Sequence, residues 1–292
     1  MPAATKVPAG NVPDENVPRE RIAFTKMNGL GNDFMVVEWP KDRPMPTPEL
    51  VRRWSDRRLG VGFDQLLLLG ARRPEGGDAS YRVFNADGGE VQQCGNGVRC
   101  LARFLAPRFG SELTLVSPAG AVAAKVRSPD DVSVALGVPD FRPGALPFLA
   151  DDERDRYRID VDGETVELGA VSMGNPHAVI AVPSVAAAPV ERLGAALQRH
   201  AAFPRRVNVG FMERVDERRI RLRVYERGVG ETLACGTGAA AAVAVGRRWG
   251  QLGERVTVEL PGGNLEVNWS GPGSPLWQTG PTAAVYEGYI EL

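Results

Sequence analysis

The sequence has little cysteine, no excess charge of either sign and no long hydrophobic run. Its 292 residues include three cysteines, too few for a disulfide framework, so we expect free thiols in a reducing compartment. The 35 Lys and Arg residues nearly balance the 36 Asp and Glu residues, which gives no electrostatic case for binding nucleic acid or a membrane. No apolar run approaches the ~20 residues of a membrane span, and the first residues lack the order of a signal peptide. A cytoplasmic protein is therefore expected.

The distribution of proline, glycine and apolar residues predicts the organisation of the chain. Residues 1–20 carry four prolines and no apolar periodicity, which predicts a disordered N-terminal tail. Beyond it, short strands alternate with a few helices, which favours an α+β (mixed α/β) fold over a doubly wound parallel sheet. One helix is expected over 98–105, closed by Pro107, and another over 185–200. The run 239–245 has no polar face, so it should form a buried helix.

The chain contains a long internal repeat. Cys94–Gly97 and Cys235–Gly238 share a cysteine and both glycines at an offset of 141 residues (94 to 235). A second block, Gly31–Asn32, matches Gly174–Asn175 at an offset of 143 (32 to 175). Blocks in the same order at nearly one spacing predict a duplicated domain. Two similar, pseudo-symmetric domains would each place one cysteine at the start of a helix.

Two such cysteines suit one kind of chemistry. Inversion of a carbon that bears a proton requires removal of the proton from one face and delivery to the other, which a thiolate and a thiol can do together. A helix N-terminus lowers the pKa of a cysteine, and its free N–H groups can hold a carboxylate. No lysine has an evident Schiff-base setting, and neither Cys94 nor Cys235 has metal-ligand spacing around it. We therefore expect no cofactor and no metal.

Other reactive residues have simpler interpretations. Cys100 lies inside the helix after Cys94, so structural burial is expected. Arg99 and Arg103 are four residues apart, which indicates a solvated stripe on that helix. His177 gains functional interest only from the Gly-Asn-Pro-His sequence in which it lies.

The motifs together resemble diaminopimelate epimerases. They run in the order of that family and span most of the chain from Phe24 onward; Asn28 replaces a histidine common in the family's opening motif. The matching stretches are Met27–Phe34, Asn85–Cys100, Gly174–His177, Asn208–Phe211 and Glu226–Gly238. The resemblance implies an isomerase that interconverts LL- and meso-diaminopimelate without a cofactor, on the route to lysine and peptidoglycan. It also implies a homodimer, with each half wrapping strands around a central helix.

The resemblance assigns roles to individual residues. Cys94 and Cys235 would be the two acid/base groups. His177 and Glu226 would tune the thiol pKa values, and Tyr286 would lie at the dimer contact. The substrate would be bound by Asn32, Gln65, Asn85, Gly95, Asn96, Asn175, Asn208, Glu226, Arg227, Gly236 and Thr237. The halves would comprise residues 21–138 with 281–292, carrying Cys94, and residues 139–280, carrying Cys235.

Three alternatives stay open. A related two-cysteine amino acid racemase, such as a proline racemase relative, would act on another substrate, although Asn96, Thr237 and Arg227 favour diaminopimelate. A relative with the pocket but without epimerase chemistry would typically lack one or both cysteines. A thiol redox protein would cycle Cys94 and Cys235 through a disulfide, which we interpret as a liability of such a site.

Overall fold

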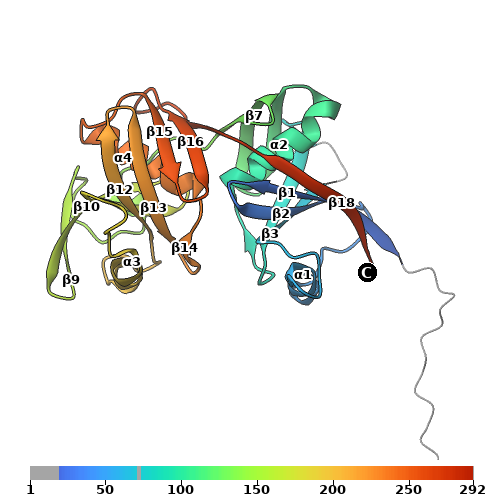
Figure 1. The fold of residues 1–292 in the computed structure, drawn as a ribbon, viewed down its shortest axis with the longest axis horizontal. Helices are drawn as coiled ribbons and strands as arrows, with labels where there is room; N and C mark the ends of the chain where they lie inside the picture. Colours follow the sequence, from blue (N-terminus) through green and yellow to red (C-terminus); the bar gives the residue numbers. More distant parts are fainter. Residues whose placement is uncertain (1–19, 71–73, 292) are drawn as a thin grey trace, which may run out of the picture.

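The computed structural model describes residues 20–70 and 74–291, so nearly all of the predicted tail lies outside the described residues. The described chain forms two lobes that lie side by side along the long axis of the molecule (Figure 1). The last strand, β18 (Ala283–Glu291), crosses from the C-terminal lobe to the N-terminal lobe, where it pairs antiparallel with β1 (Arg21–Gly29). None of the helices in the described ranges is long and apolar enough to cross a membrane.

The N-terminal half packs its strands against the helix α2 (Gly95–Phe109). The other elements are β2 (Asn32–Trp39), α1 (Pro48–Ser55), β3 (Gln65–Gly70), β4 (Ala79–Asn85), β5 (Glu90–Val91), β6 (Glu112–Ser117), β7 (Gly120–Ser128) and β8 (Asp131–Ala135). β1 and β2 are antiparallel, β2 and β3 parallel, and β3 and β4 antiparallel. β4 then runs parallel to β6, and β6, β7 and β8 form an antiparallel meander.

The C-terminal half repeats this plan around the helix α4 (Gly236–Arg248). Its other elements are η1 (Pro143–Ala145), β9 (Tyr157–Val161), β10 (Glu164–Ser172), β11 (Pro176–Ala181), α3 (Val190–Arg199), β12 (Asn208–Asp216), β13 (Arg219–Glu226), β14 (Gly230–Thr232), β15 (Arg255–Leu260), β16 (Gly263–Asn268) and β17 (Trp277–Gly280). From β10 to β17 the parallel and antiparallel pairings follow the same order as from β1 to β8. The predicted duplication and mixed α/β class are thus confirmed.

The two central helices share one hydrophobic core. Every residue from Gly238 to Gly246 in α4 is buried, as the unbroken apolar run predicts. The largest apolar cluster joins Val98 and Leu101 of α2 to the alanines of α4. β17 also pairs antiparallel with β8, so the halves are linked by a strand ladder as well as by the core. This continuity fixes the starts of the two helices relative to each other.

The predicted bounds of two helices are wrong. α2 begins at Gly95 and runs through Pro107 to Phe109, because a proline in the last turn removes a single hydrogen bond and does not end the helix by itself. Gly110 ends it, with a φ of 95° and its N–H donated to the carbonyl of Ala106. The helix expected over 185–200 is shorter and begins at Val190, directly after Pro189. The sequence pattern predicts no strand at β1, β5, β9, β10, β12, β14 or β17.

Candidate active site

Cys94 and Cys235 occupy equivalent positions in the two halves. Each is the N-cap residue of a central helix, with φ and ψ of −141° and 112° for Cys94 and of −112° and 109° for Cys235. A short strand precedes each cysteine, β5 before Cys94 and β14 before Cys235, and a loop connects the strand to the cysteine. The internal repeat in the sequence therefore corresponds to one local structure that occurs twice.

The starts of α2 and α4 meet where the two halves join. The Asn96 side chain in the first turn of α2 donates from Nδ2 to the carbonyl oxygen of Ala234, 3.3 Å away and directly before Cys235. In the N-terminal half, the Cys94 thiol lies 3.6 Å from Oδ1 of Asn32. A chain of short contacts thus runs from the opening motif, through Cys94 and its helix, to the loop that carries Cys235.

The contacts continue from Cys235 into the Gly-Asn-Pro-His motif. Sγ of Cys235 lies 3.7 Å from Oγ1 of Thr237, which accepts a hydrogen bond of 3.3 Å from Nδ2 of Asn175. Asn175 Oδ1 in turn lies 3.0 Å from Nε2 of His177. Burial, aided by the positive charge of Arg227, lowers the pKa of His177 to about 3. His177 is therefore neutral, and Thr237 and Asn175 lie between it and the Cys235 thiol.

Glu226 and Arg227 lie at the end of β13. Oε1 of Glu226 accepts a hydrogen bond of 2.5 Å from Thr232, and the backbone N–H of Arg227 donates to Oδ1 of Asn208 over 2.8 Å. Burial raises the pKa of Glu226. The negative charge of Glu226 raises the pKa of both cysteine thiols, so this carboxylate acts on both halves of the site.

The N-terminal half presents a matching set of amides. Gln65 lies opposite both Phe34 of β2 and Asn85 of β4 in the sheet, and its Nε2 donates to Oδ1 of Asn85 over 2.8 Å. Asn32 donates from Nδ2 to Asp64 over 3.0 Å. These amides lie at the ends of β2, β3 and β4, as Asn208 and Glu226 do at the ends of β12 and β13. Five of the predicted binding residues thus lie at strand ends, three in the N-terminal half and two in the C-terminal half.

The expected low thiol pKa values are wrong for this structure. Burial raises the pKa of Cys94 to about 11, although the backbone N–H groups of Gly97 and Asn96 oppose the shift. Burial and the charge of Glu226 raise the pKa of Cys235 well above its usual value, against the N–H of Gly238. Loss of solvent outweighs the helix N-terminus in both cases. Both thiols are therefore protonated at neutral pH in this structure.

Arg99 and Gln278 are two buried residues near the helix starts that the motifs did not predict, and the interpretation of Arg99 as a solvated residue is wrong. Arg99 is fully buried and does not form a solvated stripe. Its Nη1 donates to Oε1 of Gln278 over 2.7 Å and its Nη2 to Oδ1 of Asn96 over 2.8 Å. The position of Arg99 three residues after Asn96, on one helix face, was the available signal; Gln278 gave none. Cys100 is buried in the core as predicted.

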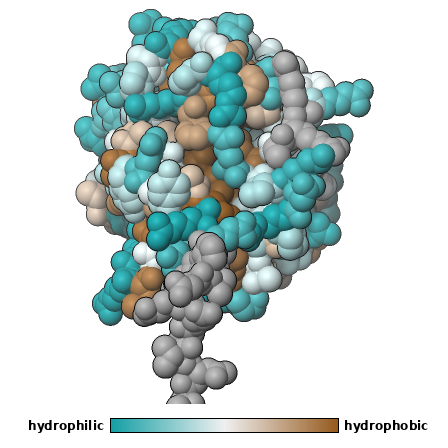
Figure 2. Space-filling view, turned by 90° about the vertical axis from the view of Figure 1, so that its right-hand side faces the viewer, coloured by the Kyte–Doolittle hydropathy of each residue, from teal (hydrophilic) through white to brown (hydrophobic). Residues whose placement is uncertain are grey.

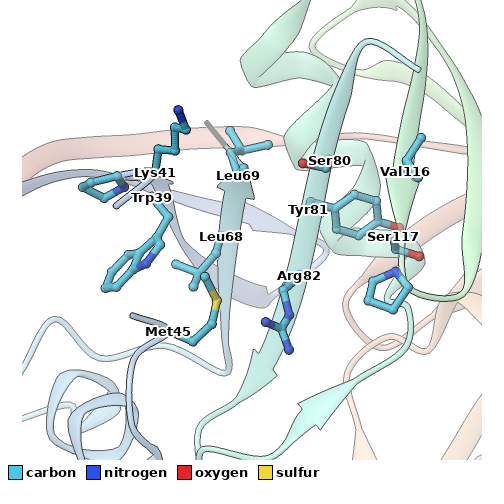
Figure 3. Close-up of a pocket in the computed structure, with 13 residues that line it drawn as sticks. Trp39, Lys41, Met45, Leu68, Leu69, Ser80, Tyr81, Arg82, Val116 and Ser117 are labelled. Carbon is cyan, nitrogen blue, oxygen red and sulfur yellow. The ribbon is translucent and has the colours of Figure 1, made fainter. Parts of the chain in front are cut away.

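Metal-ligand clusters and cavities are the remaining features by which a site can be recognised. Within 20–70 and 74–291, no group of three or more His, Cys, Asp or Glu residues is placed to hold a metal ion. A cavity of about 420 Å³ opens beside β3 and β4 and is lined by Trp39, Leu68, Tyr81 and other residues, none of them a predicted site residue (Figure 3).

A family model described as diaminopimelate epimerase matches residues 24–141 and 169–285. The chain belongs to the diaminopimelate epimerase family. The two matched ranges carry the two cysteine-bearing helices, so the family pattern covers both repeats. This membership bears out the family resemblance seen in the sequence motifs.

Relatives with that name are similar along nearly their whole length. The diaminopimelate epimerase of Alkalilimnicola ehrlichii is 51% identical over 279 residues, covering 93% of this chain and 99% of the relative. That of Chromobacterium violaceum is 50% identical over 275 residues, covering 93% of this chain and 100% of the relative.

Solved structures of more distant proteins show the same fold. A hydroxyproline epimerase from Agrobacterium vitis has a TM-score of 0.67 at 17% identity, covering 93% of each chain. A phenazine biosynthesis protein of the PhzF family from Bacillus anthracis has a TM-score of 0.64 at 16% identity, covering 94% of this chain and 100% of the other. At such identities the likeness concerns the fold alone. The sequence relatives therefore favour the diaminopimelate branch over the proline racemase alternative.

Proposed function

We propose that this protein is a diaminopimelate epimerase, an isomerase that interconverts LL- and meso-2,6-diaminopimelate without a cofactor in lysine and peptidoglycan precursor synthesis. The observation that carries the proposal is the joining of two cysteine-capped helix starts, Cys94 and Cys235, by the contact between Asn96 and Ala234. Inversion at one carbon requires two acid/base groups on opposite faces, and this contact supports such a placement of the two cysteines. The named relatives at about 50% identity support the choice of substrate.

In the proposed reaction, one cysteine as thiolate removes the proton from the α-carbon, and the thiol of the other cysteine delivers a proton to the opposite face. The thiol and thiolate exchange places, so the product complex is ready for the reverse direction. N–H groups at Gly95–Asn96 and Gly236–Thr237 hold the α-carboxylate, where charge develops as the proton leaves. The process needs no electron acceptor and no covalent intermediate.

The substrate itself supplies the charge that activates the thiols. Diaminopimelate brings two ammonium groups, and Glu226 is a half-buried carboxylate of the C-terminal half. An ammonium beside Glu226 offsets the negative charge that raises both thiol pKa values. Arg227 offers a bidentate partner for a carboxylate. Asn32, Gln65, Asn85, Asn175 and Asn208 then hold the remaining polar groups of the substrate.

We also propose a homodimer formed through β18. This strand pairs with β1 along one edge and exposes Val285, Tyr286 and Tyr289, the last with 74% of its surface accessible. Figure 2 views the end of the molecule toward which β18 runs and shows hydrophobic residues in the middle of that face, between hydrophilic ones. An apolar edge strand of this kind favours association. Sedimentation analysis of the wild type should give a dimer and of Tyr286→Glu a monomer; a monomeric wild type contradicts this proposal.

Deuterium incorporation tests the proposed reaction. Incubation of LL-diaminopimelate with the protein in heavy water should give meso product with deuterium at the inverted carbon, without added cofactor. L-Proline and trans-4-hydroxy-L-proline serve as the matched alternative substrates and should not be turned over. Turnover of either, with none of diaminopimelate, would favour the racemase alternative instead.

A further inference from the structure

Arg99 places a positive charge between the two helix starts. Its guanidinium hydrogen-bonds Asn96 and Gln278, and each of these amides reaches a residue that flanks Cys235. Asn96 donates to the carbonyl of Ala234 over 3.3 Å, and Nε2 of Gln278 donates to the carbonyl of Gly236 over 2.7 Å. A side chain of α2 therefore holds both sides of the loop that presents the thiol of α4.

This charge has no anionic partner. Arg99 has no exposed surface, and it forms none of the ion pairs found in the described parts of the chain. Its Nε atom also lacks a hydrogen-bond acceptor there. Burial lowers the pKa of Arg99 to about 10, so the side chain stays charged at neutral pH. Burial of a cation without an anionic partner is unfavourable, so Arg99 would stabilise an anion formed near it during the reaction.

Only the N-terminal half of the repeat has a positive charge at this position. The offset of 141 that relates Cys94 to Cys235 also relates Arg99 to Ala240, which is buried in α4. An arginine that only supported the duplicated fold would be expected in both halves. The single arginine instead lies where the halves join, next to the position at which the reaction creates negative charge.

We propose that Arg99 is a positioning residue whose fixed positive charge, held by Asn96 and Gln278 at the starts of α2 and α4, stabilises the thiolate and the carbanion formed between the two helices. This inference rests on the proposed epimerase function. Arg99 acts from behind the helix starts, through electrostatics and through the two amides, without touching the substrate.

Other charged and titratable groups also act on this region. Glu226 of β13 opposes Arg99 at Cys94. Cys100 of α2 and Tyr81 of β4 each interact electrostatically with the Cys94 thiol. A change made at Gln278 leaves all of these in place, and Gln278 itself is not titratable.

Two substitutions at Gln278 separate charge from structure. Gln278→Glu keeps an acceptor for Arg99 and places a carboxylate against the guanidinium, which cancels the charge. Gln278→Leu removes the same donor to Gly236 and leaves the charge of Arg99 intact. We would measure the rate at which iodoacetamide alkylates Cys94 at pH 7.5, where Arg99 is charged. Mass spectrometry locates the modified residue, and kcat and KM for diaminopimelate are measured beside it. Arg99→Lys, which keeps the charge, is the second control.

The charge model predicts that Gln278→Glu lowers the rate of Cys94 alkylation at pH 7.5 at least tenfold and lowers kcat more than tenfold. Gln278→Leu and Arg99→Lys should keep the alkylation rate within about twofold of the wild type. Equal rates for Gln278→Glu and Gln278→Leu, in folded proteins, overturn the inference. Because alkylation needs no turnover, a wild type inactive on diaminopimelate contradicts the proposed function while leaving the alkylation test of Arg99 decisive.

Discussion

Replacement of Cys235 by serine should separate activity from stability. Cys235 is 4% exposed and is the N-cap of α4. Serine is among the preferred N-cap residues and is close to cysteine in size, so we expect the free energy of unfolding to change by less than about 1 kcal/mol. A hydroxyl is, however, a far weaker acid than a thiol. The variant should therefore fold normally without its acid/base group.

The expected loss of activity follows from the role of one such group. A positioned acid or base contributes about 10²–10⁴-fold to a rate, which equals about 2.7–5.4 kcal/mol of activation free energy. Cys235→Ser should lose at least this factor in kcat for epimerisation, and Cys94→Ser likewise. The assay is conversion of LL- to meso-diaminopimelate, followed by chiral chromatography, beside urea denaturation of the same samples.

Cys100 provides the matched control. It lies inside α2 with no exposed surface, among apolar neighbours, so Cys100→Ser should cost about 1–3 kcal/mol in stability and keep kcat within a few-fold of the wild type. The two serine variants should thus show opposite effects. Turnover by Cys235→Ser within tenfold of the wild type would refute the two-base mechanism, as would an equal loss of kcat in folded Cys100→Ser.

Three further predictions follow from the described contacts. Glu226→Gln removes a negative charge that raises both thiol pKa values, so alkylation of the thiols should shift to lower pH; an unchanged profile would contradict the assigned role. The pKa of His177 falls to about 3 in the folded chain, so between pH 6.5 and 3 only the unfolded chain takes up that proton, and stability falls with pH by ~1.4 kcal/mol per unit. His177→Gln should lack this contribution, and denaturation at pH 5 should show it as a wild-type loss about 2 kcal/mol larger than in the variant; equal losses would argue against a buried neutral histidine. A Cβ at Gly262 would lie 2.2 Å from the carbonyl oxygen of Leu30, whereas a Cβ at Gly144 meets nothing within 4 Å. Gly262→Ala should therefore lower the free energy of unfolding by about 1–3 kcal/mol, and Gly144→Ala by less than ~0.5 kcal/mol. Similar thermal midpoints for the two variants would contradict this prediction, because they would show that the backbone at Leu30 moves aside at little cost.

Local patterns explain why much of the fold was predictable. The residues after Cys235 are apolar on every face of the helix, so the helix is stable only when it is buried in a core, and α4 is buried. Proline was a weaker guide: Pro107 removes one hydrogen bond near the end of α2, while Gly110 takes the positive φ that ends it. β9 pairs over its whole length with the first part of β10, and these short segments alone gave too little signal to predict the strands.

The sequence by itself determined that two cysteines lie at the starts of two related helices, because the Cys-Gly-x-Gly pattern and the duplicated order of blocks are local and repeat along the chain. The tertiary structure alone decided the direction of the thiol pKa shifts, because loss of solvent depends on what packs around Cys94 and Cys235 and here outweighs the helix N-termini. It also decided the place of Arg99, whose partner Gln278 lies 179 residues away in the sequence. Contacts over that separation arise only when the two halves close around one core.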